Sequence, residues 1–341
     1  MTTEASPPAD RTALVTGATG YIGGLLTQRL LDEGWRVRVL TRHKEGIEQR
    51  GWGQRVEVIE GDADSADDLA TAFEGVQTAY YLIHSMGQAD DFAARDRALA
   101  QTFGDAAARA GVRRIVYLSG LHPDGELSPH LASRVEVGDI LLASGVPTAV
   151  IQAAVVVGNG SVSFDMLRYL AERLPVMVAP KWLNNRIQPI AIDDVLHYLV
   201  GAADLPDDVN RTFDVGGPEV LTYADMLQRF SAVTGLRHRL IVTLPVLTPH
   251  LASLWIGLVT PLDVGVAKPL IGSLVHEVFC RENDIDSYVP APDGDLTDFD
   301  DAVRAAMVEA PADHALRNVV AVAAALAVLV AAAFLGLRRR A

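Results

Sequence analysis

Three glycines near the start of the chain have the spacing of a dinucleotide-binding turn. Gly17, Gly20 and Gly23 lie three residues apart. In such a turn the first glycine bends the chain tightly, the second lets a pyrophosphate approach the backbone, and the third lets a helix pack closely on a strand. The unpaired amides at the start of that helix, and its dipole, attract phosphates. The spacing therefore predicts a dinucleotide site.

The segments around these glycines match the strand, turn and helix that such a site needs. Residues 13–15 are apolar, and the apolar residues between 22 and 31 recur at helical spacing. A second strand, residues 35–41, follows at the distance that the fold requires. The alternative is a strand-to-helix turn that binds no ligand.

The residues at the end of the second predicted strand indicate whether NAD or NADP is preferred. NAD sites normally carry an acidic residue there, whereas an arginine nearby accommodates the 2′-phosphate of NADP. Here Thr41 and Arg42 are followed by His43 and Lys44, and no acidic residue precedes Glu45. The pattern favours NADP, with NAD less favoured. The alternative is that Arg42 is a solvated loop charge.

Strands and helices continue to alternate along the first half of the chain. We expect strands at 55–60, 78–83, 113–118 and 148–157, and helices at 65–73, 90–110 and 129–144. Such alternation predicts a parallel sheet wound on both faces. Ligands of these sheets lie outside the carboxyl ends of the strands, where Gly17, Arg42, Asp62, His84 and Ser119 are expected.

We therefore expect an α/β, Rossmann-type doubly wound parallel sheet with a smaller α/β C-terminal lid and a C-terminal transmembrane helix. The expected divisions are a disordered lead-in at 1–11, an NAD(P)-binding domain at 12–160, a substrate or lid region at 161–283, an acidic linker with one helix at 284–317, and a membrane span at 318–337.

The predicted span carries no charge from Asn318 to Leu337, and three arginines follow it. Twenty helical residues cover roughly 30 Å, the thickness of a bilayer's hydrocarbon core. The first twelve residues lack the features of a signal peptide. We expect a single-pass C-terminal anchor in the cell membrane and a cytoplasmic body, although the positive-inside rule leaves the topology open. An Ala-rich packing helix is the alternative.

Composition excludes several classes of function. The net charge of −14 argues against nucleic-acid binding. A single cysteine, Cys280, excludes an intramolecular disulfide and a cysteine-cluster zinc site, and the nine histidines lack metal-ligand spacing. Residues 240–279 are apolar but interrupted by prolines, which argues against a membrane span there. They could form core, a hydrophobic substrate wall or a surface resting on a bilayer.

Several motifs together resemble a known superfamily. TGATGYIGG at 16–24, the Gly61-Asp62 pair, VYLSG at 116–120, and the stretches IQPIAIDDV and FDVGGPEVLTY resemble the short-chain dehydrogenase/reductase superfamily over residues 12–308. HSMG at 84–87 and LPVMVAPKW at 174–182 resemble the atypical, NmrA-related NAD(P)H-binding group, and within it the YbjT-like set.

This resemblance implies roles for residues at the strand ends. Thr16 to Gly23 would hold the pyrophosphate, Arg42 beside Thr41 the 2′-phosphate, Asp62 the adenine, and the strand end at Leu82 and His84 the ribose. Ser119 would lie near the nicotinamide. The expected cofactor residues are thus Thr16, Gly17, Thr19, Gly20, Tyr21, Ile22, Gly23, Thr41, Arg42, Asp62, Leu82, His84 and Ser119.

Catalytic members of the superfamily use a tyrosine and a lysine four residues later to transfer a proton while hydride moves. None of the three lysines of this chain has a tyrosine four residues before it. The helix at 129–144 offers His130 and Arg134 at that spacing, and Leu121 stands where the family serine usually lies. Ser119, His130 and Arg134 are the remaining catalytic candidates, with a histidine that could titrate near neutral pH. A structural histidine and a surface arginine are the alternative.

Three functions fit these observations unequally. The first is a membrane-tethered NADPH-dependent oxidoreductase that acts on a small lipophilic substrate. The second is a non-catalytic NADPH-binding sensor or assembly factor with protein partners, which the missing tyrosine and lysine favour. A sugar-nucleotide epimerase or dehydratase fits the architecture but lacks the catalytic pair, and it ranks last.

Overall fold

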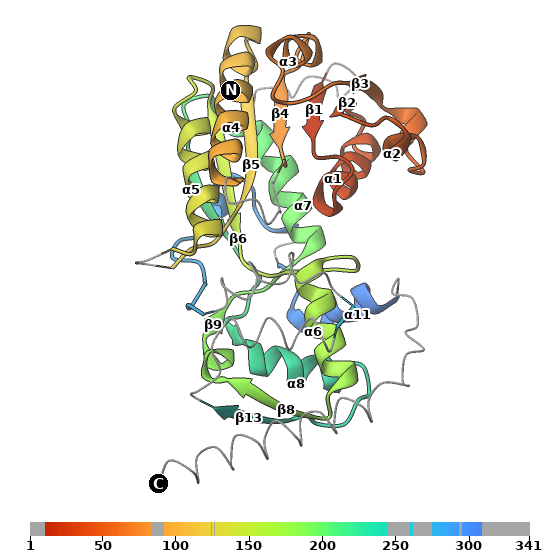
Figure 1. Cartoon of the computed structure of the whole chain (residues 1–341), viewed down its shortest axis with the longest axis vertical. Helices are drawn as coiled ribbons and strands as arrows, with labels where there is room; N and C mark the ends of the chain where they lie inside the picture. Colours follow the sequence, from red (N-terminus) through yellow and green to blue (C-terminus); the bar gives the residue numbers. More distant parts are fainter. Residues whose placement is uncertain are drawn as a thin grey trace, which may run out of the picture.

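A seven-stranded, fully parallel sheet forms the upper lobe of the molecule in Figure 1, and a smaller α/β lobe lies below it. The computed structural model describes residues 11–83, 92–123, 125, 127–244, 260–261, 275–292 and 295–308. The predicted Rossmann-type α/β class is confirmed.

The strand order of the large sheet is β11-β6-β5-β4-β1-β2-β3. Its strands are β1 (Thr12–Thr16), β2 (Arg36–Thr41), β3 (Glu57–Glu60), β4 (Thr78–Tyr81), β5 (Arg114–Gly120), β6 (Thr148–Ala153) and β11 (Arg211–Val215). The direction of winding reverses between β1 and β4. Ligands of doubly wound sheets bind at such a reversal, at the carboxyl ends of the strands.

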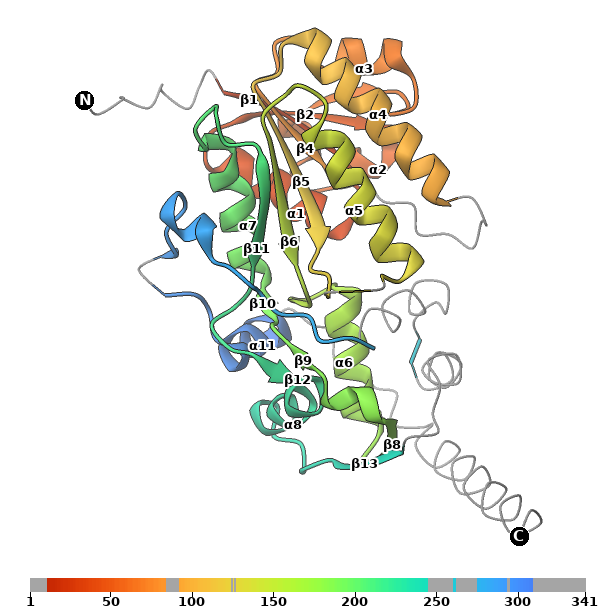
Figure 2. The same cartoon turned by 90° about the vertical axis from the view of Figure 1, so that its left-hand side faces the viewer.

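Helices cover both faces of this sheet (Figure 2). On one face lie α1 (Tyr21–Asp32) and α7 (Ile192–Gly201), which contribute Leu26 and Leu199 to a shared apolar core. On the other face lie α3 (Ala66–Ala72), α4 (Phe92–Ala110) and α5 (Pro129–Leu142), around the fully buried Phe103. The sheet is therefore buried on both sides, as its apolar strands predict.

Within the described residues, the lower lobe contains three short two-stranded sheets and three α-helices around its own core. The sheets pair β7 (Val156–Val157) with β10 (Ile190–Ala191), β8 (Val176–Pro180) with β13 (Leu240–Leu244), and β9 (Arg186–Ile187) with β12 (Leu221–Thr222). The helices are α6 (Val162–Arg173), α8 (Tyr223–Val233) and α11 (Phe299–Val308).

The chain passes from one lobe to the other more than once, so residues 161–244 contribute elements to both lobes. The single strand expected at 148–157 is divided into β6 and β7, which belong to different lobes. After the lower-lobe strands, α7 and β11 return to the upper lobe, where β11 pairs in parallel with β6. Phe213 is fully buried there, which explains why this late strand joins the large sheet.

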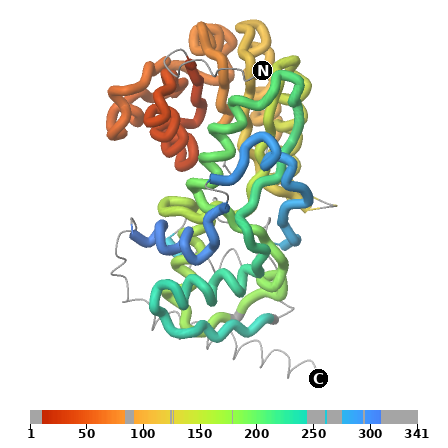
Figure 3. The backbone as a smooth tube through the Cα atoms, turned by 180° about the vertical axis from the view of Figure 1, so that it is seen from behind, coloured from red at the N-terminus to blue at the C-terminus, as the bar shows by residue number. Residues whose placement is uncertain are grey.

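Residues 275–292, which we call the strap, pair with β9 of the lower lobe at Val278 and then run along the edge of the upper lobe beside β11 and α7 (Figure 3). Asp284 pairs with Arg211 on β11 at 2.7 Å, and Tyr198 of α7 donates a 2.7 Å hydrogen bond to Asp286. Residues 284–292 of the strap were expected to begin an acidic linker. Asp284 and Asp286 instead bind a basic and a hydroxyl group of the upper lobe.

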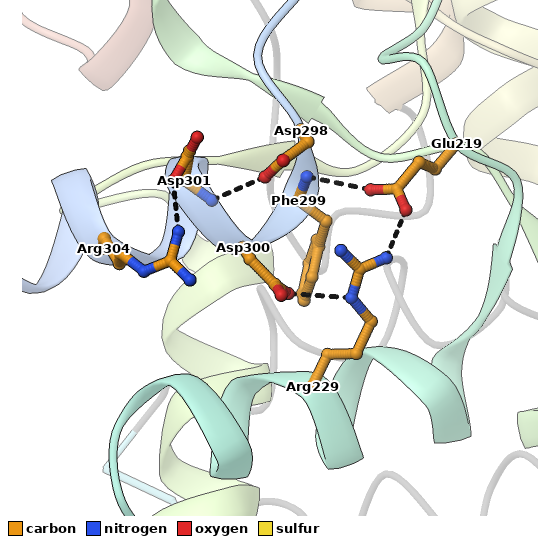
Figure 4. A network of polar contacts seen from close by, with 7 residues as sticks. All are labelled: Glu219, Arg229, Asp298, Phe299, Asp300, Asp301 and Arg304. Atoms are coloured by element: carbon orange, nitrogen blue, oxygen red, sulfur yellow. Dashed lines mark hydrogen bonds and ion pairs between the residues drawn. The ribbon is translucent and has the colours of Figure 1, made fainter.

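Helix α11 is clamped to the lower lobe by the network in Figure 4. Arg229 of α8 pairs with Asp300 at 2.8 Å and with Glu219, whose other oxygen accepts a 3.1 Å hydrogen bond from the amide of Phe299. The Phe299 ring is buried in the lower core. The one helix that was expected within the linker is present as α11, and it packs on the lower lobe.

No helix in the described ranges is both long and apolar enough to cross a membrane. The predicted span at 318–337 lies outside these ranges, as do His84 and most of the lead-in at 1–11. The span therefore stays a prediction.

Candidate functional site

The glycine turn between β1 and α1 excludes side chains at two of its three positions. Gly17 has φ +76°, and a Cβ atom there would lie 2.5 Å from the carbonyl oxygen of Leu82. A Cβ atom at Gly23 would lie 2.2 Å from the carbonyl oxygen of Gly17. Both distances are shorter than those at which Cβ atoms approach other heavy atoms in proteins. The turn is therefore pressed against the end of β4 on one side and against α1 on the other, as the spacing predicts.

Gly20 is the N-cap of α1, and no side chain caps this helix end. Its amide donates a 2.9 Å hydrogen bond to Gly17, and the first turn of α1 contains no acidic residue. The free amides that follow carry the positive end of the helix dipole. This end of α1, with Ile22 in its first turn, is suited to bind the phosphates of a dinucleotide.

Thr16 has a structural role as well as its place in the expected cofactor set. The side chain is fully buried, and its hydroxyl donates to the carbonyl of Tyr80 at 3.0 Å and accepts from the amide of Leu82 at 3.3 Å. The hydroxyl thus ties β1 to β4 at the reversal point. It positions Leu82 beside Gly17, so both expected residues lie at the same edge of the sheet.

Tyr21 lies at the junction of the two lobes. A Cβ atom at Gly158 would meet the Tyr21 hydroxyl at 2.3 Å, and one at Gly160 would meet its ring at 3.4 Å. The glycines of the loop after β7 therefore allow the lower lobe to approach the start of α1. The Tyr21 side chain thus packs against the loop after β7, while its backbone belongs to the first turn of α1.

Basic residues follow β2, next to the glycine turn. Arg42, His43 and Lys44 are exposed, and the Thr41 hydroxyl contacts both the amide and the carbonyl of His43. The short helix α2 (Glu45–Glu48) comes next, and a Cβ atom at its Gly46 would lie 3.5 Å from the Thr19 methyl group. The β2–β3 connection is therefore in reach of the turn.

Arg50 belongs to the same connection and was not predicted as a site residue. Its guanidinium donates a 2.6 Å hydrogen bond to the carbonyl oxygen of Thr19. The bond places a permanent cation beside the glycine turn. No sequence pattern around Arg50 indicates this contact, because it depends on how the loop after β2 folds back.

Asp62 follows β3 at the neighbouring strand end. The amide of Gly61 donates a 2.9 Å hydrogen bond to Thr41, and the amide of Asp62 donates to Asp68 at 2.8 Å. The Asp62 carboxylate accepts the amide of Asp64 at 3.4 Å and is half-buried. Its place beside Thr41 is compatible with the adenine role that the resemblance implies.

Ser119 and Gln152 form a polar pair on adjacent strands. Ser119 of β5 is in register with Gln152 of β6, and the two side chains are 3% and 6% exposed. The Ser119 hydroxyl has no hydrogen-bond partner among the described residues, and no hydrogen bond joins the Gln152 amide to another residue there. Gln152 was missed, although it is the one polar residue within the apolar run 149–157.

Helix α5 brings Arg134 to the end of β5. Its guanidinium donates to the carbonyl oxygen of Leu118 and lies 5.7 Å from the Tyr117 ring, whose hydroxyl donates to the backbone of Arg134 at 3.2 Å. Leu121, where a serine would be expected, is 4% exposed and buried. Arg134 thus lies at the carboxyl end of β5, where it is a permanent cation.

Contrary to the expectation from the sequence, the His130 imidazole does not titrate near neutral pH. Burial, together with the positive charge of Arg134, lowers the pKa of the His130 imidazole to about 4. The ring is therefore neutral at pH 7, and it can form hydrogen bonds but cannot supply an acidic proton. No group of three or more metal-binding side chains occurs in the ranges that the structure describes.

Several known proteins are similar to this chain in sequence. The model of the NmrA-like family matches residues 9–245. A reductase of Streptomyces griseus named for (4-alkanoyl-5-oxo-2,5-dihydrofuran-3-yl)methyl phosphate is 32% identical over 232 residues, which cover 65% of this chain and 73% of that protein. The ceramide reductase of Caulobacter vibrioides is 27% identical over 239 residues, which cover 67% of this chain and 72% of that protein.

The fold is also found in solved structures. The triphenylmethane reductase of Citrobacter sp. matches with a TM-score of 0.69 at 18% identity, over 87% of this chain and 99% of that protein. A structure of the same reductase with NADP(H) matches with a TM-score of 0.66 at 19% identity and the same coverage. The fold is that of NAD(P)-binding reductases, and the chain belongs to the NmrA-like family.

Proposed function

We propose that this protein is an NADPH-dependent reductase that is tethered to the cell membrane and acts on a small lipophilic substrate. The observation that carries the proposal is the glycine turn with its uncapped helix end, flanked by Arg42 and by Arg50. Arg42 directly after β2, with no acidic residue before Glu45, favours a cofactor with a 2′-phosphate, and Arg50 adds a cation beside the turn. The reductases among the relatives, and the NADP(H) complex of the similar Citrobacter enzyme, support this choice.

The residues near the end of β5 limit the kind of substrate. When bound, NADPH would supply a hydride. Ser119 and Gln152 can donate hydrogen bonds to a substrate oxygen, since both lack partners among the described residues. Neither neutral His130 nor Arg134 can release a proton near neutral pH. An acceptor that is already electron-poor, such as a quinone or a conjugated carbonyl, needs no proton before hydride arrives, and its product can take the proton from water.

A cofactor titration tests the first part of this proposal. The full chain in detergent is titrated with NADPH and with NADH, and nicotinamide fluorescence is followed. We expect Gly20→Asp to abolish binding, because a carboxylate would face the phosphates, and Arg42→Ala to remove the preference for NADPH. Arg55→Ala serves as the control, since Arg55 pairs with Asp32 on the surface at 3.0 Å. Absence of binding of either nucleotide would overturn the assignment.

Turnover is tested separately with a panel of quinones and conjugated carbonyls of increasing apolar chain length. Oxidation of NADPH that needs both the substrate and Gly20 supports a reductase. Tight NADPH binding without oxidation by any member of the panel would favour the second candidate, a non-catalytic NADPH-binding sensor or assembly factor. The observation behind that candidate is the replacement of the family's catalytic groups by Leu121, neutral His130 and fixed Arg134.

The membrane tether rests on the uncharged run at 318–337. We expect the full chain to stay with membranes after alkaline extraction, and a chain lacking residues 318–341 to lose that resistance. Protease treatment of sealed vesicles of known orientation shows on which side of the membrane the folded part of the chain lies. Release of the full chain by alkali would contradict the tether and leave the reductase assignment intact.

A further inference from the structure

The two-stranded sheet β8–β13 presents an apolar face to solvent. Val176, Leu240 and Val242 are 51%, 58% and 44% exposed, and Leu240 is the register partner of Val176. Along the same strands Met177 is 2% exposed, and Ile241 packs on the lower core. The face toward the core is therefore satisfied, while the opposite face carries aliphatic side chains where a solvated strand would have polar ones.

Basic residues stand at both ends of this sheet. Lys181 directly follows β8, Arg237 and His238 precede β13, and all three are exposed. No ion pair joins Lys181 or Arg237 to an acidic side chain in the described part of the chain. Since the strands are parallel, the cations lie at opposite ends of the apolar face.

The sequence around both strands contains no acidic residue. Residues 174–192 and 226–262 lack Asp and Glu, in a chain that has 43 acidic residues among 341 and a net charge of −14. An average stretch of the second length would hold several. The two acid-free stretches are distant in sequence, and the pairing of β8 with β13 brings them together. The positive character of this end of the molecule therefore arises from two separate segments.

We propose that the β8–β13 face docks on the surface of a bilayer that contains anionic lipids. Aliphatic side chains can enter the interfacial region of a bilayer, and the cations near them can bind the anionic lipid headgroups. The overall acidity of the chain would otherwise repel an anionic membrane, so the local charge sets the orientation. Figure 1 shows β8 and β13 at the end of the molecule opposite α3. Docking would place the lower lobe between the glycine turn and the membrane.

The experiment reports which part of the full chain meets the lipid. In a Cys280→Ser background, an environment-sensitive fluorophore is attached at Leu240→Cys, at Val242→Cys and, as a control, at Glu74→Cys, which is exposed beside α3. Each protein is reconstituted with its C-terminal run intact into phosphatidylcholine vesicles with or without phosphatidylserine. The tether is thus the same in every sample.

We expect a blue shift at positions 240 and 242 with phosphatidylserine, a smaller one without it, and none at position 74. High salt, or Lys181→Gln with Arg237→Gln, should weaken the shifted population by roughly fivefold for each cation removed. No shift at 240 and 242, or an equal shift at 74, overturns the proposal. A shift that appears without vesicles and grows with protein concentration also overturns it, because it assigns the face to a second copy of the chain.

Discussion

The guanidinium of Arg50 donates a 2.6 Å hydrogen bond to the carbonyl oxygen of Thr19, inside the glycine turn. Thr19 follows β1, whereas Arg50 lies in the connection from β2 to β3. The segment that carries Arg42 is therefore fastened to the turn that is suited to hold the pyrophosphate. Recognition of the two ends of an adenosine 2′,5′-bisphosphate unit would be coupled through this one bond.

Replacing Arg50 tests that coupling. Arg50→Ala should weaken NADPH binding about tenfold, which corresponds to about 1.4 kcal/mol, because a charged hydrogen bond to the turn and a nearby cation are both lost. Fluorescence titration measures the change, with Arg55→Ala as the matched control. Equal weakening by both substitutions would mean that only the general charge matters.

The third glycine can be tested through stability. A Cβ atom at Gly23 would lie 2.2 Å from the carbonyl oxygen of Gly17, so Gly23→Ala must push α1 away from β1. We expect a loss of about 1–3 kcal/mol in the free energy of unfolding, together with loss of cofactor binding. Urea unfolding of Gly51→Ala is the control, since a Cβ atom there would meet nothing within 4 Å. An unchanged midpoint for Gly23→Ala would contradict the packing described here.

Ser119 and Gln152 should matter for turnover more than for folding. Neither side chain has a hydrogen-bond partner in the described part of the chain, so Ser119→Ala and Gln152→Leu should leave the free energy of unfolding within about 0.5 kcal/mol. If the protein is a reductase, kcat should fall while NADPH affinity is retained. Thr148→Val is the contrasting variant, because the Thr148 hydroxyl contacts two buried carbonyls at 2.9 and 3.0 Å and its loss should destabilise the fold. Lost cofactor affinity in Ser119→Ala would assign the hydroxyl to binding instead.

The partly buried imidazole of His130 predicts a pH dependence of stability. The pKa of His130 is lowered from 6.5 to about 4, so between these values the unfolded chain binds a proton that the folded chain does not. The free energy of unfolding should therefore fall as the pH decreases from 6.5 toward 4, by at most about 3 kcal/mol from this group. His130→Gln should flatten that dependence, as urea unfolding at several pH values would show. An NMR titration that places the His130 pKa near 6.5 would refute the prediction.

The ion pairs of α11 allow a partly buried network to be compared with an exposed pair. Arg229→Ala removes the partner of both Glu219 and Asp300 and should cost about 1–3 kcal/mol of stability. Arg304→Ala breaks a pair whose side chains are 58% and 62% exposed and should cost less than about 1 kcal/mol. Thermal unfolding of the two variants compares them directly. Similar losses would show that the network adds nothing beyond a surface pair.

Acid should weaken the same clamp. Hydrogen bonding to Arg229 lowers the pKa of the Glu219 carboxyl below its ordinary value of 4.5. The folded chain thus holds Glu219 ionised where the unfolded chain protonates it. The stabilising contribution is complete above pH 4.5 and is lost as the pH falls through the lower, folded pKa.

The sequence was sufficient to predict what depends on local patterns. Gly17 and Gly23 lie in the turn that their spacing requires, and the expected second strand ends at Thr41 as β2 does. Contacts between residues that are distant along the chain could not be predicted from such local patterns. Arg50 reaches Thr19 only through the loop after β2, and Gln152 acquires meaning only once β6 is known to lie beside Ser119.

The same limit explains the domain boundaries. The acidity of residues 284–308 is typical of a solvated linker when the residues are considered alone. The structure pairs Asp284 with Arg211 and Asp300 with Arg229, partners that lie far away along the chain. Because opposite charges distant in sequence leave no periodic signal, the composition suggested a spacer where the fold has packed elements.

The return of the chain to β11 after the lower lobe has a consequence for biosynthesis. Strand β11 is aligned with β6 from Arg211 and Ala149 onward, and α6 and β8 lie between them in the chain. A ribosome therefore completes the edge of the large sheet only after it has delivered much of the smaller lobe. The strap that covers this edge emerges later still. Before β11 emerges, a nascent chain would expose β6 as an unpaired edge strand, and a chaperone that shields extended segments would have its natural substrate at that stage.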